Sequence, residues 1–296
     1  MTRPLLSRIA ETLYWIGRYI ERADDTARLL DVSVHRVLDE PETFRSIFDV
    51  LGLRHSASPT APALIRRLAY DPAEPASIAA SVRAARDSAR GVREVLSSEV
   101  WECLNVTWHQ LSGLEALSPH AYLSFVRERA ALFFGLADAT MSRDDCWRFL
   151  VLGRSLERVD MTTRLLAVHL TGDRRLLLQA SGADESFTRT HGVNADHVLE
   201  FLLLDRLYPR SVVYSLMTAE KCLRALAPAT ARAGVADPAQ AAIGRVRTGL
   251  EYADLAELRD RVPELLGTLQ EACAAAGEAI SQRFFQHREE LAWVGA

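Results

Sequence analysis

The sequence predicts an all-α protein, built as one bundle-like domain of about nine or ten helices. Apolar residues recur at alternating spacings of three and four, the period of one helical face, and the strict alternation of strands is almost absent. The 296 residues contain no glycine-rich phosphate loop and no strand–helix–strand rhythm. Hydrophobic residues make up 49% and charged residues 25% of the chain, which is an ordinary globular mixture.

The clearest expected helix covers residues 7–37, whose apolar positions keep the three–four spacing throughout. Pro41 breaks this pattern, and residues 54–62 are predicted to form a loop because Ser, Pro and Thr cluster there. Ser77 is the candidate N-cap of a later helix. Further helices are expected over 63–68, 76–96, 99–111 and 121–141.

The second half of the chain opens with another strongly patterned helix, expected over residues 142–170. Loops are predicted at 172–182, which begins and ends with a glycine, and at 192–196, which begins with a glycine. The remaining expected helices cover 196–204, 211–226, 240–258 and 263–287.

The two strongly patterned helices share a sequence. Residues 17–30 and 153–166 both follow G-R-x-[IL]-E-R-x-D-x-T-x-R-L-L, at a separation of 136. A second landmark repeats at a separation of 134, because the Asp, Pro, Ser and Ile of 71–78 match the Asp, Pro, Ser and Val of 205–212. We therefore predict an internal duplication within a single domain (1–296). The two repeats, at about 5–140 and 141–288, would share one core about a pseudo-twofold axis.

The shared helix carries a polar stripe beside its apolar one. At about 100° per residue, Gly17, Glu21, Asp24 and Arg28 fall on one face. The matching residues of the second copy are Gly153, Glu157, Asp160 and Arg164. Glycine inside a helix costs about 1 kcal/mol relative to alanine, which indicates that another helix or a ligand lies against it.

One interpretation of this stripe is a semi-buried ion-pair network. Asp24 with Arg28, and Asp160 with Arg164, are four residues apart, the right spacing for pairing along one helix. Buried charges must be paired, so such residues would fix how the helices pack and perform no chemistry.

The other interpretation is a ligand site or catalytic site. Packing of the two halves would bring Glu21 and Glu157 together, and close carboxylates raise one another's pKa and serve as acid and base. Neighbouring arginines would line this cleft and hold a carboxylate or phosphate. These arginines are Arg18, Arg22, Arg154 and Arg158. The same arginines would repel a cation, so neither a metal nor another cofactor is predicted.

Other charged residues are less specific candidates for the cleft. Arg86 and Arg90 belong to an arginine stripe that is either a solvated face or a complement to the carboxylates. Glu99 and Glu102 share one face of the next helix. The eight histidines form no zinc-protease motif, and the four cysteines are far apart in the sequence. No catalytic nucleophile is therefore nominated.

Charge and hydropathy exclude two classes of partner. The formal net charge is -4 and no recognition motif is present, so nucleic-acid binding is not expected. No apolar run approaches the ~18 residues that a membrane span needs, and the chain starts on a charged amphipathic segment. The sequence therefore predicts a cytoplasmic protein that does not enter the membrane.

Residues 6–24, 86–105 and 208–211 resemble the bacterial alpha-E domain family, and the resemblance extends over essentially the whole chain. Its most specific part is Tyr-Trp-Ile-Gly-Arg-Tyr-Ile-Glu-Arg-Ala at 14–23. The family is all-α and has characteristic glutamates, whose positions Glu21 and Glu157 hold here. The resemblance also adds Arg210 to the candidate cleft. The second copy departs from the first in having Met161 where the first has Asp25.

The resemblance implies a part in a peptide system. Genes of this family, long labelled a domain of unknown function, commonly neighbour those of a circularly permuted ATP-grasp ligase and a transglutaminase-like peptidase. The chain would then be a non-catalytic partner of these proteins, with an acidic peptide as a further candidate ligand. The alternative is an enzyme that acts on the peptide product, with Glu21 or Glu157 as acid or base and arginines as carboxylate clamps.

Overall fold

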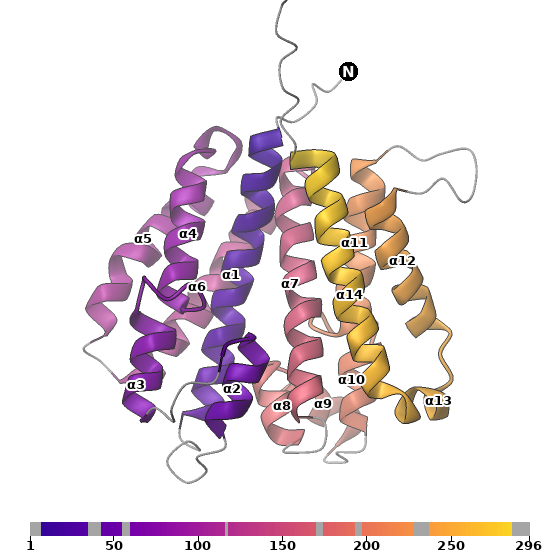
Figure 1. Ribbon diagram of the computed structural model, residues 1–296. Coiled ribbons are helices and arrows are strands. Elements are labelled where there is room, and N and C mark those ends of the chain that lie inside the picture. The colour runs from indigo at the N-terminus through magenta and orange to yellow at the C-terminus, as the bar shows by residue number, and fades with distance from the viewer. Residues whose placement is uncertain are drawn as a thin grey trace, which may run out of the picture.

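Two long helices run side by side through the middle of the molecule in a computed structural model of the protein (Figure 1). They are α1 (Ser7–Ser33) and α7 (Asp145–His169). The structure describes residues 7–34, 43–54, 60–115, 118–169, 174–192, 197–227 and 237–285. Within these residues every regular element is a helix, which confirms the all-α prediction.

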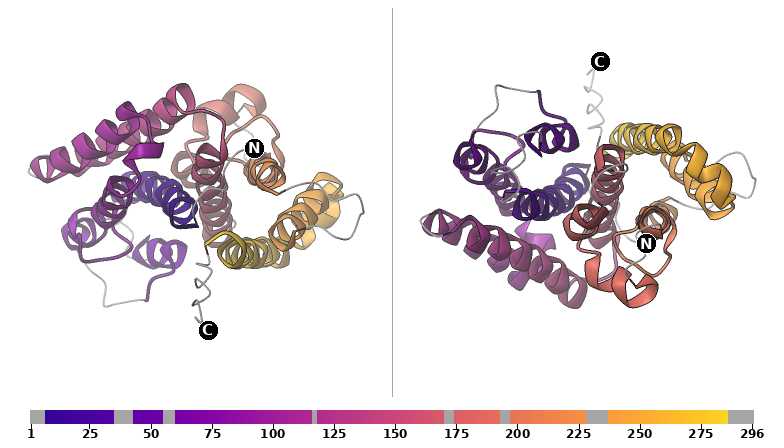
Figure 2. Two further views of the ribbon diagram at one scale, coloured as in Figure 1. Left: turned by 90° about the horizontal axis from the view of Figure 1, so that it is seen from above. Right: turned by 90° about the horizontal axis from the view of Figure 1, so that it is seen from below.

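The helices of the first half lie on the α1 side of the central pair. Both α4 (Ile78–Arg90) and α6 (Pro119–Thr140) pack directly on α1. The outer helix α5 (Ser98–Leu114) packs on α4 and α6. Figure 2 shows this group on one side of the pair and the helices of the second half on the other.

The helices of the second half are arranged around α7. Both α11 (Val212–Leu226) and α14 (Val262–Ile280) pack on α7, and α12 (Pro238–Glu251) packs on α11 and α14. Buried apolar side chains from both sides of the central pair form one continuous hydrophobic cluster. None of the helices in the described segments combines the length and the apolar character that a bilayer crossing requires.

Short helices make the predicted number of helices wrong, because the described residues contain fourteen α-helices and not nine or ten. Four helices were not predicted as separate elements: α2 (Thr43–Leu51), α8 (Arg174–Ala180), α9 (Asp184–His191) and α13 (Leu255–Asp260). The short helices α3 (Ala61–Ile65) and α10 (Val198–Leu204) overlap the expected helices 63–68 and 196–204. The four missed helices have six to nine residues, which make too few turns for a three–four spacing to be recognised. The glycines at 172 and 182 led to a loop prediction over 172–182, part of which forms α8. The expected helix 240–258 is divided into α12 and α13.

The helix that follows each member of the central pair packs on the other member. Although α2 follows α1 in the chain, it packs on α7, and α8, which follows α7, packs on α1. Both lie at the same end of the bundle in Figure 1, because α1 and α7 run in the same direction. The expected helix 7–37 ends at Ser33, and residues 35–42 lie outside the described residues.

The second repeated landmark starts a helix in both halves. Ser77 caps α4 and Ser211 caps α11, each accepting from the backbone amide three residues later. Each serine hydroxyl also donates to a backbone carbonyl six residues earlier, that of Asp71 or Asp205, at 2.5 Å. The predicted N-cap at Ser77 is confirmed, and the matching serine performs the same function.

Candidate functional site at the central helix pair

The two central helices meet backbone to backbone at a glycine of each. A Cβ on Gly17 would lie 2.1 Å from the carbonyl oxygen of Leu150, and a Cβ on Gly153 would lie 2.0 Å from that of Tyr14. Neither position has room for a side chain. The prediction that another helix or a ligand lies against these glycines is confirmed, and at both positions it is the other central helix.

A buried glutamate of each central helix is ion-paired with arginines of the other. Glu157 accepts from the Nε atoms of Arg18 and Arg22 of α1, both at 2.6 Å. Glu21 accepts from Nε and Nη2 of Arg158 of α7, at 2.5 and 3.1 Å. The glutamate side chains are only 2% and 0% exposed. We call the contacts of Glu21 with Arg158 and of Glu157 with Arg22 the reciprocal Glu–Arg pairs.

Electrostatics keeps both glutamates ionised. Burial alone would raise the pKa of each carboxyl, but the charges of Arg158 and Arg210 outweigh it and lower the pKa of Glu21. The two α1 arginines lower the pKa of Glu157 in the same way. The pKa of neither glutamate is raised, and the contacts support the ion-pair interpretation.

A second group of carboxylates surrounds Arg210, which lies in the turn before α11. Its Nη1 donates to Asp25 at 2.6 Å, and its Nη2 contacts Glu21 at 3.2 Å and also pairs with Asp24. Nε of Arg28 completes the group by donating to Asp24 at 3.1 Å. Carboxylate oxygens of the three acidic residues lie within 4.8 Å of one another, a spacing that a metal ion could bridge. Here the guanidinium of Arg210 provides the positive charge among them.

Asp25 is a member of this group that the sequence analysis missed. The repeat pattern pointed away from it, because its counterpart in the second copy is Met161. Burial, and then the negative charge of Glu21, raise the pKa of Asp25 to about 8 in spite of Arg210. The Asp25 carboxyl is therefore largely protonated at neutral pH, next to two carboxylates.

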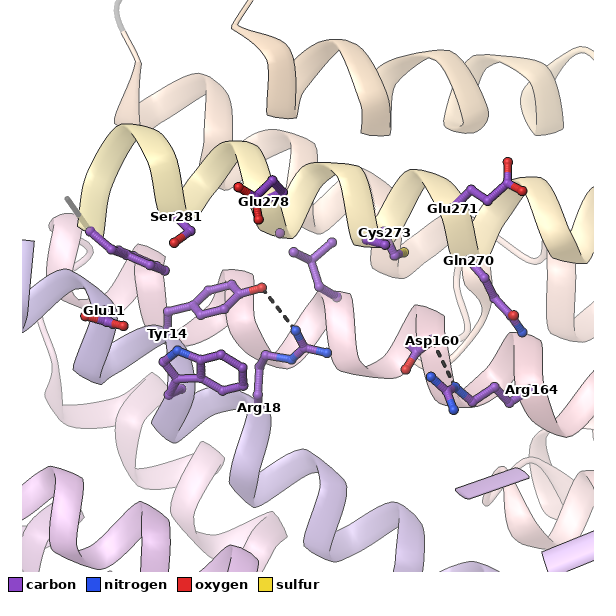
Figure 3. Close-up of a pocket in the computed structure, with 15 residues that line it drawn as sticks. Glu11, Tyr14, Arg18, Asp160, Arg164, Gln270, Glu271, Cys273, Glu278 and Ser281 are labelled. Atoms are coloured by element: carbon purple, nitrogen blue, oxygen red, sulfur yellow. Dashed lines mark hydrogen bonds and ion pairs between the residues drawn. The ribbon is translucent and has the colours of Figure 1, made fainter. Parts of the chain in front are cut away.

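Three of the predicted residues reach a cavity of about 650 Å³ between α1, α7 and α14 (Figure 3). They are Arg18, Asp160 and Arg164. Nε of Arg164 donates to Asp160 at 3.0 Å, so the predicted pairing four residues apart is confirmed here, as it is for Asp24 and Arg28. The α14 wall of the cavity was not foreseen, because its polar residues belong to no motif.

Residues 5–285 match a family described as a predicted alpha-helical domain with a conserved ER motif. The chain belongs to the Alpha-E family. Similar Alpha-E relatives are uncharacterized proteins of Mycobacterium bovis and Mycobacterium tuberculosis. Each is 28% identical, over 71% of this chain and 28% of the relative. The chain thus spans less than a third of the length of these relatives, and no solved structure matches it.

The Alpha-E description names an ER motif, and this chain has Glu–Arg dipeptides at 21–22 and 157–158. Both lie in the central helices, and each supplies one glutamate and one arginine to the reciprocal pairs. In this chain the two dipeptides link the two central helices of the bundle.

Several predicted residues form no ion pair with the central glutamates of the Alpha-E bundle. Arg154 stacks on the Phe134 ring, 4.7 Å from its centroid, and its Nη1 lies 3.9 Å from Asp138. Arg86 donates to Asn105, on the α4–α5 side. The side chains of Arg90, Glu99 and Glu102 are exposed on α4 and α5. The structure does not bring these last four predicted residues to the central pair, because helical periodicity identifies a face and not its neighbour.

We expect Asp25→Asn to flatten the pH dependence of stability. The pKa of Asp25 rises from 3.8 to about 8 on folding, so its contribution is fully present below about pH 4 and is lost as the pH rises towards 8. Urea unfolding should show the wild type losing a few kcal/mol over this range relative to the variant, at ~1.4 kcal/mol per pKa unit as an upper bound. Asparagine keeps the carbonyl that accepts from Arg210. Exposed Asp87 provides the control Asp87→Asn, and parallel pH profiles of wild type and Asp25→Asn would contradict the assignment.

Proposed function

We propose that this Alpha-E chain is a non-catalytic partner in a bacterial peptide-synthesis or peptide-modification system, working with an ATP-grasp-type ligase and a transglutaminase-like protein. The observation that carries the proposal is that the reciprocal Glu–Arg pairs neutralise one another inside the bundle. Carboxylates occupied in this way hold helices together and are not available to a substrate. The choice of partners follows from the gene neighbourhood that the family resemblance implies.

The length of the relatives supports a partnership. The match covers 28% of the mycobacterial proteins, so more than two thirds of each relative lies outside it. In these relatives the matched region is covalently joined to other sequence, and we infer that an Alpha-E bundle works next to such a neighbour. We place the complex in the cytoplasm, where the ATP that such a ligase consumes is available.

We also infer that the bundle arose by duplication of one helical unit, with repeats at about 5–140 and 141–288 around a pseudo-twofold axis. The reciprocal glycine contacts and Glu–Arg pairs support this origin. So do two further matched contacts: a Cβ on Gly182 would lie 2.5 Å from Arg28, and one on Gly52 would lie 2.7 Å from Arg164. The halves are not equal, because Arg210 corresponds to an alanine in the first half.

The proposal is tested by mixing the purified chain with an ATP-grasp-type ligase of the same organism. We expect the two to co-elute at micromolar concentration, with a rise of 32.9 kDa in the mass measured by light scattering for each bound chain. The rate of ATP consumption by the ligase in the presence of its peptide substrate should also change. An ATP-grasp enzyme of an unrelated pathway is the control. Separate elution together with an unchanged rate would overturn the proposal.

A further inference from the structure

The inner wall of the cavity between α1, α7 and α14 offers hydrogen-bond donors that the ion pairs leave unused. The Tyr14 side chain is only 2% exposed, and its hydroxyl accepts a long hydrogen bond of 3.4 Å from Nη1 of Arg18. Burial raises the pKa of Tyr14, so this hydroxyl keeps its proton. Among the residues that the structure describes, no acceptor receives that proton or the Nη2 protons of Arg18. The two side chains, one buried and one partly exposed, therefore present a donor pair to an oxygen in the cavity.

The same end of the cavity also carries unpaired negative charge. Figure 3 shows Glu11 and Glu278 on either side of Tyr14, from α1 and α14. Glu278 accepts from the Gln282 amide at 2.7 Å, and within the described part of the chain no arginine, lysine or histidine pairs with either glutamate. A positively charged group next to the donor pair would therefore gain two carboxylate partners.

The rest of the lining combines apolar surface, one ion pair and the polar side chains of Gln270, Glu271 and Ser281. Trp15, Leu156 and Phe285 provide apolar surface, while Arg164 at the far end is paired with Asp160. Over the whole lining, four carboxylates face two guanidinium groups, which disfavours a strongly acidic ligand. The volume of about 650 Å³ falls within the range of small-molecule sites.

We propose that this cavity binds a zwitterionic amino acid or short peptide, whose carboxylate accepts from Tyr14 and Arg18 and whose ammonium group lies between Glu11 and Glu278. The ligand needs both charges. Its negative group would be held by the donor pair, and its positive group by the two carboxylates at the same end of the cavity. This inference goes beyond the partner role, since the chain alone contains every residue of the site.

Titration calorimetry of the chain alone with L-alanyl-L-alanine tests the ligand class. We expect saturable binding of this dipeptide, and at least tenfold weaker binding of N-acetyl-alanyl-alanine and of alanyl-alanine amide. Each blocked peptide lacks one charged group and leaves its protein partners unpaired. Absence of saturable binding, or equal binding of all three peptides, would overturn the proposal.

Two glycine variants of α14 locate the site. A Cβ on Gly277 would lie 3.8 Å from the Tyr14 hydroxyl, so the side chain of Gly277→Leu would fill the cavity. Gly267 is on the same helix with no atom within 4 Å of an added Cβ, which makes Gly267→Leu the matched control. Binding should be lost only in Gly277→Leu, and unchanged affinity there would place the dipeptide elsewhere and refute the site. Tyr14→Phe should weaken dipeptide binding about tenfold.

Discussion

Gly153→Ala is expected to cost more than about 4 kcal/mol of the free energy of unfolding, or to prevent folding. The added Cβ would lie 2.0 Å from the carbonyl oxygen of Tyr14 and 2.9 Å from its carbonyl carbon. Both atoms belong to the α1 backbone, which cannot rotate aside as a side chain does. Relief requires α1 and α7 to separate, and separation would also lengthen the reciprocal Glu–Arg pairs. Urea unfolding followed by circular dichroism measures the loss, and Gly17→Ala should behave in the same way.

The matched control is Gly135→Ala in α6. Gly135 is also inside a helix, but an added Cβ there meets no atom within 4 Å. The higher helix propensity of alanine should stabilise this variant by up to about 1 kcal/mol. The two substitutions are chemically identical, so opposite signs isolate the helix contact. A loss below about 1 kcal/mol for Gly153→Ala would show that the two backbones are not in contact.

The central helices were predictable because a three–four spacing held over 25 or more residues has few alternative explanations. The glycines were informative for a related reason. Glycine destabilises a helix, so a glycine at the same position of two matching helices indicates a compensating contact. Each central helix provides that contact for the other. Helices such as α2 and α8 lack that length, and the packing of their buried residues on the long central helices stabilises them.

The charged contacts were predictable only where one helix contains both partners. The spacing of Asp160 and Arg164 is enough to predict their pairing. By contrast, the partner of Glu21 depends on how α1 and α7 pack, and Arg210 reaches Asp25 from 185 residues further along the chain. The raised pKa of Asp25 depends on all of these contacts together, so no local pattern contained it.

Glu157→Gln is expected to cost about 3 kcal/mol or more, because it leaves Arg18 and Arg22 facing a neutral amide. Glu21→Gln should cost clearly less, although its carboxylate is equally buried. Loss of the Glu21 charge removes one of the causes that keep Asp25 protonated, so Asp25 can ionise and supply a negative charge to Arg210, to which it is already hydrogen-bonded. The second half has Met161 at the position of Asp25 and so lacks this replacement charge.

The double variant Glu21→Gln/Asp25→Asn decides whether this compensation operates. Removing both carboxylates should produce a loss comparable to that of Glu157→Gln, and larger than the sum of the two single variants at pH 7. Glu102→Gln, on an exposed part of α5, is the control and should change stability by less than about 0.5 kcal/mol. Additive effects would mean that Asp25 does not respond to the charge of Glu21. A Glu157→Gln protein with wild-type stability would instead favour a catalytic or ligand-binding role for that glutamate, because a carboxylate that holds two helices together cannot be neutralised without loss of stability.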